Sequence, residues 1–417
     1  MQTRVPPTGT PAAAVRSSRL VVGKAGRSRS IGFLLAYALA NAGGVLGYLP
    51  LLSMLLPLKV EAMAGEERLS LFTACMVTGG IAASVSNILF GWLSDRSVAR
   101  GGGRRPWVVG GLAATGLSFA GIAVAATPLG ILVAVAGFQV AVNAGLAPLT
   151  AIMADEIPDG QKGVAGGLLS LGFPLAAALS AVLMSTATLG ERGRLLVVLL
   201  AMTACLAPLL LAGARRVEIA APIPAQKRGM RRDLAVAWGA RILVQVANNV
   251  LSTYLLFYFE SLGSEPHPVV AARVGHVLTL GYLVPVPIAL LVGRGSDRIG
   301  RRKPFLLISA AVAAAGLIAM ALSTNEAAGA IAFVCYSAGS GSFLVLHSAF
   351  TMQLLPSPDR RGRDLGLLNL TNTLPALLGP VLTWQLATPA SFDHALLVLA
   401  GLASLGMLLV LPIRGLR

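Results

Sequence analysis

The sequence predicts an all-α integral membrane protein in which twelve transmembrane helices form two parallel six-helix repeats. Three observations predict this fold: a composition poor in charge, a series of long apolar segments, and a charged phrase that occurs twice. Hydrophobic residues make up 55% of the chain, charged residues 12%, and the mean hydropathy is +0.77. A soluble domain is about a quarter charged. This chain therefore lacks the polar surface that a soluble protein of its size needs.

Twelve apolar segments are each long enough to cross the hydrocarbon core of a bilayer, which takes about 20 helical residues. Glycine and proline occur inside many of them, which membrane helices tolerate because neighbouring helices satisfy the freed backbone groups. The predicted helices cover residues 31–56, 70–93, 107–126, 128–153, 164–186, 194–214, 235–260, 272–293, 304–323, 327–352, 365–386 and 393–413.

The distribution of basic residues predicts the orientation. If the N-terminus is cytoplasmic, most of the 33 Lys and Arg residues fall in cytoplasmic segments, as membrane proteins prefer. We therefore expect both termini in the cytoplasm, with residues 1–30 forming a disordered tail rather than a signal peptide. The preference for Arg over Lys is typical of a GC-rich bacterial genome, so we expect the cell inner membrane.

The net charge of +16 would also suit a nucleic-acid-binding protein. The basic residues, however, lie in short clusters between apolar segments without interleaved aromatic residues, so we expect no nucleic-acid partner. The three cysteines show no metal or disulfide spacing. No nucleophile–base pair or phosphate-binding loop is visible either. We therefore expect neither an enzyme, nor a cofactor, nor a metal site.

Two pairs of similar phrases indicate an internal repeat. "GWLSDRSVARGGGRRP" (91–106) and "GRGSDRIGRRKP" (293–304) share Gly-x-x-Ser-Asp-Arg, then Gly-Arg-Arg, then Pro. "KGVAGGLLSL" (162–171) and "RGRDLGLLNL" (361–370) open the fifth helix of each half. Because each half has an even number of spans, the halves have the same orientation. The predicted parts are a first half, a cytoplasmic linker and a second half, at residues 31–213, 214–233 and 234–417.

The repeated phrase resembles the loop between helices 2 and 3 of the major facilitator superfamily (MFS), with the pattern Gly-x-x-x-Asp-Arg/Lys-x-Gly-Arg/Lys-Arg/Lys. Residues 293–302 match it, and residues 91–105 match with extra residues from Val98 to Gly102. The longer spacing and "GRDLGLLNLTNTLP" are similar to the melibiose- and sucrose-type sugar–cation symporters. The resemblance covers nearly the whole chain after the tail. It implies the MFS fold and a transporter of small-molecule substrates.

The charged phrases predict contacts at the cytoplasmic ends of the helices. Asp95 can accept hydrogen bonds from the N-terminus of a neighbouring helix, and the resemblance implies the helix that opens at 362–367. The arginines can pair with Asp155 or Glu156, and in the second half with Asp359 or Asp364. Such pairs would form a cytoplasmic latch; alternatively, the arginines only fix the topology. The candidate gating residues are Gly91, Asp95, Arg96, Arg104, Arg105, Asp155, Glu156, Gly293, Asp297, Arg298, Arg301, Arg302, Asp359 and Asp364.

The resemblance places substrate in a central cavity lined by helices 1, 4, 7 and 10, near the bilayer midplane. For each amide at that depth, the alternative is an interhelical hydrogen bond worth about 0.6 kcal/mol. Arg241 either recognises an anion, serves gating, or extends to the inner interface. His347 is either linked to protons or a satisfied structural group. The candidate substrate-binding residues are Asn41, Gln139, Asn143, Arg241, Gln245, Asn249, Tyr282, Tyr336, Ser340, His347 and Asn372.

The predicted function is secondary active transport of a small organic solute by alternating access, the solute being sugar-like or an organic anion. One alternative is an efflux pump for amphipathic compounds; another is a non-transporting membrane receptor or scaffold. No carboxylate is expected at mid-span, where the melibiose-type symporters carry acidic cation-site residues. Three coupling mechanisms therefore remain as alternatives: coupling to a proton, coupling to another cation, and simple exchange. We expect a monomer in the lipid bilayer.

Overall fold

The computed structural model describes residues 28–64, 67–186, 188–214, 224–263, 267–386 and 392–414. Most of these residues are helical, and none of them is in a β-strand. The helices are α1 (Ile31–Pro50), α2 (Leu56–Ala64), α3 (Arg68–Ala99), α4 (Arg105–Val124), α5 (Pro128–Glu156), α6 (Lys162–Leu169), α7 (Gly172–Ser185), α8 (Glu191–Leu211), α9 (Pro224–Leu262), α10 (His267–Leu283), α11 (Pro285–Ile299), α12 (Lys303–Ala321), α13 (Glu326–Gln353), α14 (Arg361–Leu386) and α15 (Asp393–Val410).

The helices confirm the predicted fold class. Eleven helical stretches among the described residues are long and apolar enough to cross a membrane, and α14 covers the remaining predicted span. Two predicted spans consist of two consecutive helices, and the helix of the first predicted span, 31–56, continues beyond its predicted end. A π-helical turn at Leu51–Leu55 joins α1 to α2, and the pairs α6–α7 and α10–α11 follow one another almost without a break. The chain therefore has the twelve-helix arrangement that the apolar pattern predicts.

Side-chain caps explain where several helices begin. The side chains of Ser30, Thr127 and Asn325 accept hydrogen bonds from the backbone three residues further on, at the starts of α1, α5 and α13. Gly300, with φ 71°, ends α11 in the left-handed conformation that glycine adopts readily.

Two predicted boundaries are wrong. We expected two helices to end at residues 93 and 293, but α3 continues to Ala99 and α11 to Ile299. The polar residues that follow Gly91 and Gly293 remain helical because the ends of other helices pack against them. The predicted linker is also partly helical, since α9 begins at Pro224. The rest of the linker, at residues 215–223, and the tail before residue 28 lie outside the described residues.

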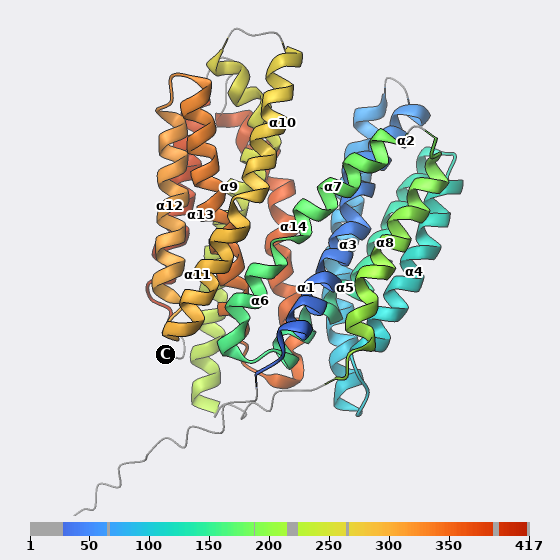
Figure 1. Ribbon diagram of the computed structural model, residues 1–417, viewed down its shortest axis with the longest axis vertical. Helices are drawn as coiled ribbons and strands as arrows, with labels where there is room; N and C mark the ends of the chain where they lie inside the picture. Colours follow the sequence, from blue (N-terminus) through green and yellow to red (C-terminus); the bar gives the residue numbers. More distant parts are fainter. Residues whose placement is uncertain are drawn as a thin grey trace, which may run out of the picture.

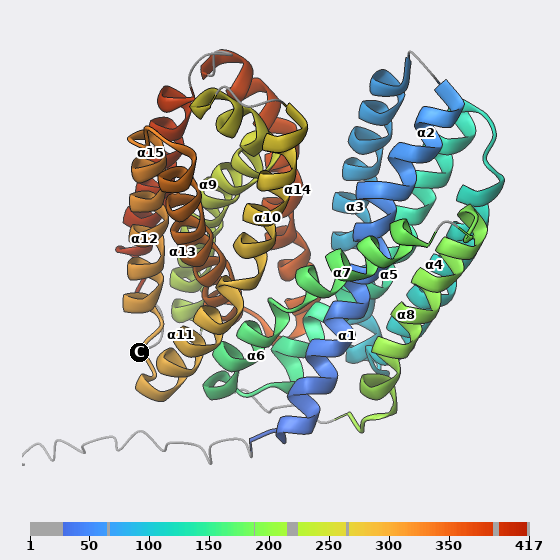
Figure 2. The same cartoon turned by 45° about the horizontal axis from the view of Figure 1, so that its top comes forward.

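Helices α1–α8 form one bundle and α9–α15 form the other, as Figures 1 and 2 show. Two elements connect the bundles: α14 packs on α3 and α5 of the first half, and α6 packs on α11 and α13 of the second. In both figures the bundles approach one another most closely at the end where α6 lies and where α14 begins. We call this the motif end, because it carries Asp95 and Asp297. The described chain ends also lie there.

Candidate functional site

Asp95 in α3 and Asp297 in α11 each bind the first turn of a helix from the opposite half. Asp95 Oδ1 accepts a hydrogen bond from Gly362 N at 2.9 Å, and Oδ2 accepts one from Arg363 N at 3.0 Å, at the start of α14. Asp297 accepts from the backbone N–H groups of Gly163 and its successor, at 3.0 and 2.9 Å, at the start of α6. Each carboxylate thus satisfies unpaired helix N–H groups and faces the positive end of the helix dipole.

Glycine pairs bring the backbones into contact beside these carboxylates. A Cβ added at Gly91 would lie 2.3 Å from the carbonyl oxygen of Gly362. A Cβ added at Gly293 would lie 2.3 Å from the carbonyl oxygen of Gly163. Any side chain at these positions must therefore displace backbone. The two halves can approach this closely only because all four positions are glycine.

Asp155 at the end of α5 connects the halves through two arginines. Arg104 Nε donates to Asp155 Oδ2 at 2.6 Å, while its Nη2 donates to Asp95 Oδ1 at 2.8 Å and its Nη1 to Ser94 Oγ at 2.7 Å. Arg361 of the second half donates to Asp155 Oδ1 at 2.9 Å. These charged side chains are at most a tenth exposed. The contact between halves is therefore a buried network rather than a set of solvated pairs.

Glu156 joins two further arginines to the same corner. Arg105 binds its carboxylate through both terminal nitrogens, at 2.5 and 3.2 Å. Arg29, just before α1, binds Glu156 Oε2 at 2.6 Å and stacks over Phe33. The backbone of Arg29 also exchanges two hydrogen bonds with the amide of Gln161. These bonds fix the start of α1 against the loop that leads into α6.

The second half has a simpler version of this network. Arg302 donates to Asp297 Oδ1 at 3.1 Å and to the carbonyl oxygen of Ala349 at 2.5 Å. The repeat alignment places Leu354 where the first half has Asp155. A backbone carbonyl therefore takes part of the role that a carboxylate has in the first half. The two halves share the helix-capping aspartate but not the bridging one.

Several predicted gating residues lie outside the network. Arg96, Arg298, Arg301 and Asp359 are exposed and form no ion pair with the described residues; Arg96 stacks on a tryptophan ring at 4.8 Å. Asp364 is buried and pairs with its neighbour in sequence, Arg363. Of the two carboxylates expected to serve the second half, Asp364 pairs with Arg363 outside the repeated phrase, whereas Arg302 of the phrase pairs with Asp297.

Arg241 on α9 lies between the halves and contacts only neutral groups among the described residues. Its Nε donates to Thr371 Oγ1 at 3.1 Å. Nη1 donates to Ser348 Oγ and to the carbonyl oxygen of Leu344, both at 3.1 Å. Nη2 makes only a long contact, 3.4 Å, with Asn372 Oδ1. The guanidinium is therefore held in place, but none of these partners neutralises its charge.

A cavity of about 90 Å³ adjoins this guanidinium, and both halves line it. Gln245 donates to Asn372 Oδ1 at 2.7 Å, and Asn372 donates to Asn369 Oδ1 at 2.7 Å, which orders the amides at its wall. None of the lining residues is acidic. They are Asn87, Ala147, Thr150, Arg241, Ser348, Thr351, Met352, Leu365, Leu368, Asn369 and Asn372.

Other predicted substrate residues contact neighbouring helices. Asn143 accepts a hydrogen bond from Asn87 at 2.8 Å and donates to the carbonyl oxygen of Gln139 at 2.9 Å, all within the first half. Tyr336 and Ser340 are 2% exposed, and the Tyr336 backbone lies against Gly316 of α12. These contacts favour the interhelical alternative for Asn143 and Tyr336, while Ser340 is hydrogen-bonded to Ser337 of its own helix.

His347 and the remaining candidates are also apart from the cavity lining. His347 is fully buried, its Nε2 lies 2.9 Å from the carbonyl oxygen of Ala237, and its ring packs on Phe343, which fits a structural role. Asn41 lies beside the start of α7, and Asn249 is half-buried on α9. Tyr282 of α10 stacks on Phe173 of α7, with centroids 6.3 Å apart, and so joins the halves.

Sequence reasoning missed Arg29, Lys162, Arg361 and the hydroxyl groups around Arg241. Lys162 is 1% exposed and pairs with Asp159 at 2.7 Å. Lys162 and Arg361 occupy equivalent positions in the two "GxxxGLL" phrases. The sequence pattern that could have found Lys162 and Arg361 was therefore the basic residue directly before the first glycine of each phrase.

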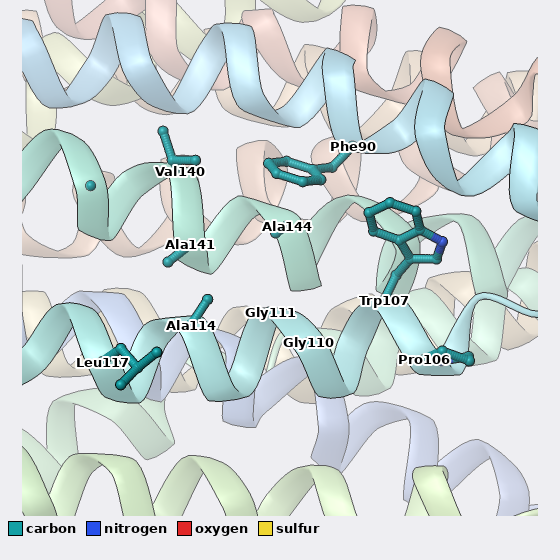
Figure 3. Close-up of a pocket in the computed structure, with 11 residues that line it drawn as sticks. Phe90, Pro106, Trp107, Gly110, Gly111, Ala114, Leu117, Val140, Ala141 and Ala144 are labelled. Atoms are coloured by element: carbon teal, nitrogen blue, oxygen red, sulfur yellow. The ribbon is translucent and has the colours of Figure 1, made fainter.

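A larger groove lies between α3, α4 and α5 (Figure 3). It encloses about 560 Å³ and is lined by apolar and small residues, including Phe90, Trp107, Leu117 and Val140. No charged or amide side chain lines it. The groove therefore offers nothing that would recognise a polar solute.

The fold is that of a helical membrane protein, and comparisons with known proteins show which proteins it is similar to. The family model of the Major Facilitator Superfamily matches residues 237–416. "Uncharacterized MFS-type transporter YfiU" of Bacillus subtilis (strain 168) is 37% identical over 102 residues, 24% of this chain and 19% of the relative. "Uncharacterized MFS-type transporter Rv2994" of Mycobacterium tuberculosis (strain ATCC 25618 / H37Rv) is 28% identical over 189 residues, 44% of this chain and 41% of the relative. The matches thus span less than half the length of these relatives.

Solved structures show the same fold over nearly the whole chain. The E. coli fucose:proton symporter FucP matches with a TM-score of 0.72 at 13% identity, covering 94% of this chain and all of that one. The human organic anion transporter MFSD10 (TETRAN) matches with a TM-score of 0.67 at 16% identity, covering 92% and 100%. Together the comparisons show that the second half of the chain is similar to the Major Facilitator Superfamily and that the whole chain has the fold of its solved transporters. These matches do not confirm the narrower likeness to the melibiose- and sucrose-type sugar–cation symporters.

Proposed function

We propose that this protein is a secondary active transporter that moves a small organic anion across the cell inner membrane by alternating access. The observation that carries the proposal is Arg241, a guanidinium whose described partners are all neutral, beside a cavity lined by both halves. A charge at this depth is costly unless it faces a cavity or a partner. An anionic substrate group would supply the missing negative charge.

The size of the cavity limits what it holds. A volume of about 90 Å³ gives room for a carboxylate or phosphate group beside the guanidinium. The ordered amides of Gln245, Asn369 and Asn372 favour neutral polar groups on the rest of the solute. This lining supports a polar anion over the apolar compounds of an efflux pump.

Alternating access requires the halves to separate at one end while they meet at the other. The motif-end network supports such a state, because its helix caps, glycine contacts and buried ion pairs all join one half to the other. We propose that the network is the latch that closes the cytoplasmic side, with both termini on that side.

Transport by the purified protein in liposomes tests the proposal. We expect uptake of one or more anionic solutes from a panel of matched acids and neutral analogues. Arg241→Gln should lower uptake of the anion by about a hundredfold, since a charge-assisted contact is worth about 1.5–3 kcal/mol. Arg231→Gln is a matched control, because Arg231 is exposed on the same helix.

Two results would contradict the proposal. Equal transport by Arg241→Gln and by the control would remove the anion site. A protein that binds solutes but moves none of them would favour the receptor or scaffold alternative.

A further inference from the structure

A second charged cavity lies at the end of the first half opposite the motif end. It encloses about 390 Å³ where α2, the end of α4 and the start of α8 meet, at the upper right of Figure 1. None of its residues belongs to the gating or substrate sets. The lining residues are Leu55, Leu58, Lys59, Ala62, Met63, Ala125, Ala126, Glu191 and Arg194.

The charges of this lining do not balance. Lys59 Nζ donates to Glu191 Oε1 at 2.8 Å, and Glu191 is the only acidic residue in the lining. Arg194 Nε is buried and has no hydrogen-bond partner in the described part of the chain. One cation is therefore paired, while the second lacks an anion. A buried N–H without a partner is rare in proteins and indicates an oxygen that is supplied from elsewhere.

The surrounding backbone also favours an anion. The start of α8 has Gly190 at its cap position, without a side-chain hydrogen bond to the first turn. The first-turn N–H groups are therefore not capped by a side chain, and the one acidic residue of this turn, Glu191, is paired with Lys59. The π-helical turn that ends at Leu55 places this lining residue just before α2, and such turns are frequent at binding sites.

The rest of the lining is apolar, so the ligand carries hydrocarbon as well as charge. Leu58 is 40% exposed and Leu55 is buried, which gives an apolar wall that continues to the outside of the bundle. The apolar span of α4 ends here at Val124, and that of α8 begins here at Glu191. Phospholipid headgroups lie at this level of a membrane.

We propose that this cavity binds the phosphate group of an anionic phospholipid. Arg194 and Lys59 contact the phosphate oxygens, and Leu58 and Met63 contact the first part of an acyl chain. A bound lipid would join α2 to the start of α8 and so stabilise the outer end of the first half.

Native mass spectrometry of the full-length protein with added phosphatidylglycerol tests the proposal. We expect a phosphatidylglycerol adduct that binds at least about tenfold more tightly than phosphatidylcholine. Arg194→Gln should weaken the phosphatidylglycerol adduct by about tenfold, which corresponds to the loss of one charged contact. Arg192→Gln removes the same charge two residues away from an exposed position and should leave the adduct unchanged.

If Arg194→Gln does not fold, Ala62→Phe fills the exposed rim of the cavity and should weaken the adduct in the same way. Equal binding of phosphatidylglycerol and phosphatidylcholine would overturn the proposal, and so would an adduct that the variants leave unchanged. Competition by millimolar inorganic phosphate alone would assign the cavity to a free anion and reject the lipid.

Discussion

Asp95→Asn perturbs the contact between the halves by replacing one carboxylate oxygen with an amide nitrogen. The Asp95 carboxylate accepts two backbone N–H groups of α14 and one N–H of Arg104. Asparagine has only one acceptor oxygen and no charge, so at least one charge-assisted hydrogen bond is lost. Such a bond contributes about 1.5–3 kcal/mol, and the interaction with the helix dipole adds about 0.3–1 kcal/mol.

The closed motif end should therefore lose about 2–4 kcal/mol relative to the open one. Since about 1.4 kcal/mol is a factor of ten, the ratio of closed to open molecules should fall by about thirtyfold to several hundredfold. We expect Asp95→Asn to lower transport while expression stays intact. Asp297→Asn should act in the same direction, because Asp297 caps α6 in the same way.

Electron–electron distance measurements in proteoliposomes can follow this shift. Spin labels at Arg96→Cys and Arg298→Cys lie on exposed positions of α3 and α11, after the exposed Cys335 has been replaced by serine. Asp95→Asn should increase the population at the longer distance. Asp359→Asn, an exposed carboxylate at the same end, is the control. Full transport together with an unchanged distance distribution in Asp95→Asn would refute the reasoning.

Three further predictions follow from the motif end. Gly91→Ala should slow transport strongly, because its Cβ would lie 2.3 Å from backbone oxygen, whereas Gly110→Ala, with open space around it, should not. Glu156→Gln should lower the melting temperature of the purified protein, since it leaves two arginines without their carboxylate; Glu61→Gln, at an exposed pair, should have little effect. Arg301→Cys should react with impermeant thiol reagents only from the cytoplasmic side, and labelling from outside would contradict the orientation.

Hydropathy and the internal repeat were enough to predict the fold class, because twelve apolar segments leave few other arrangements in a bilayer. The repeated phrase also located Asp95 and Asp297, since an acidic residue in a basic segment needs a special partner. Arg241 stood out for a similar reason: it is a charge in an apolar segment. In each case the local sequence was sufficient, because a charged side chain in or beside an apolar membrane segment is costly unless it has a specific partner.

The sequence could not show which way a polar side chain faces within a buried helix. Asn143 and Tyr336 were expected at the substrate, but they contact neighbouring helices of their own half, and Ser340 bonds within its own helix. Membrane helices are apolar on all sides, so their periodicity does not distinguish a face toward a cavity from a face toward a neighbour. The role of Arg29 was equally hidden, because its partner Glu156 is far away in sequence.

Helix α14 explains how the candidate substrate site and the latch could act on one another. Its first turn is capped by Asp95 and crosses Gly91, and its next turns, from Leu365 to Asn372, line the cavity beside Arg241. An anion bound at Arg241 would contact the same helix whose start closes the motif end. Because a helix moves nearly as a rigid body over so few turns, a shift at the cavity must appear at the cap. Substrate binding and opening of the motif end can therefore be coupled through α14 alone, because this helix contributes to both sites.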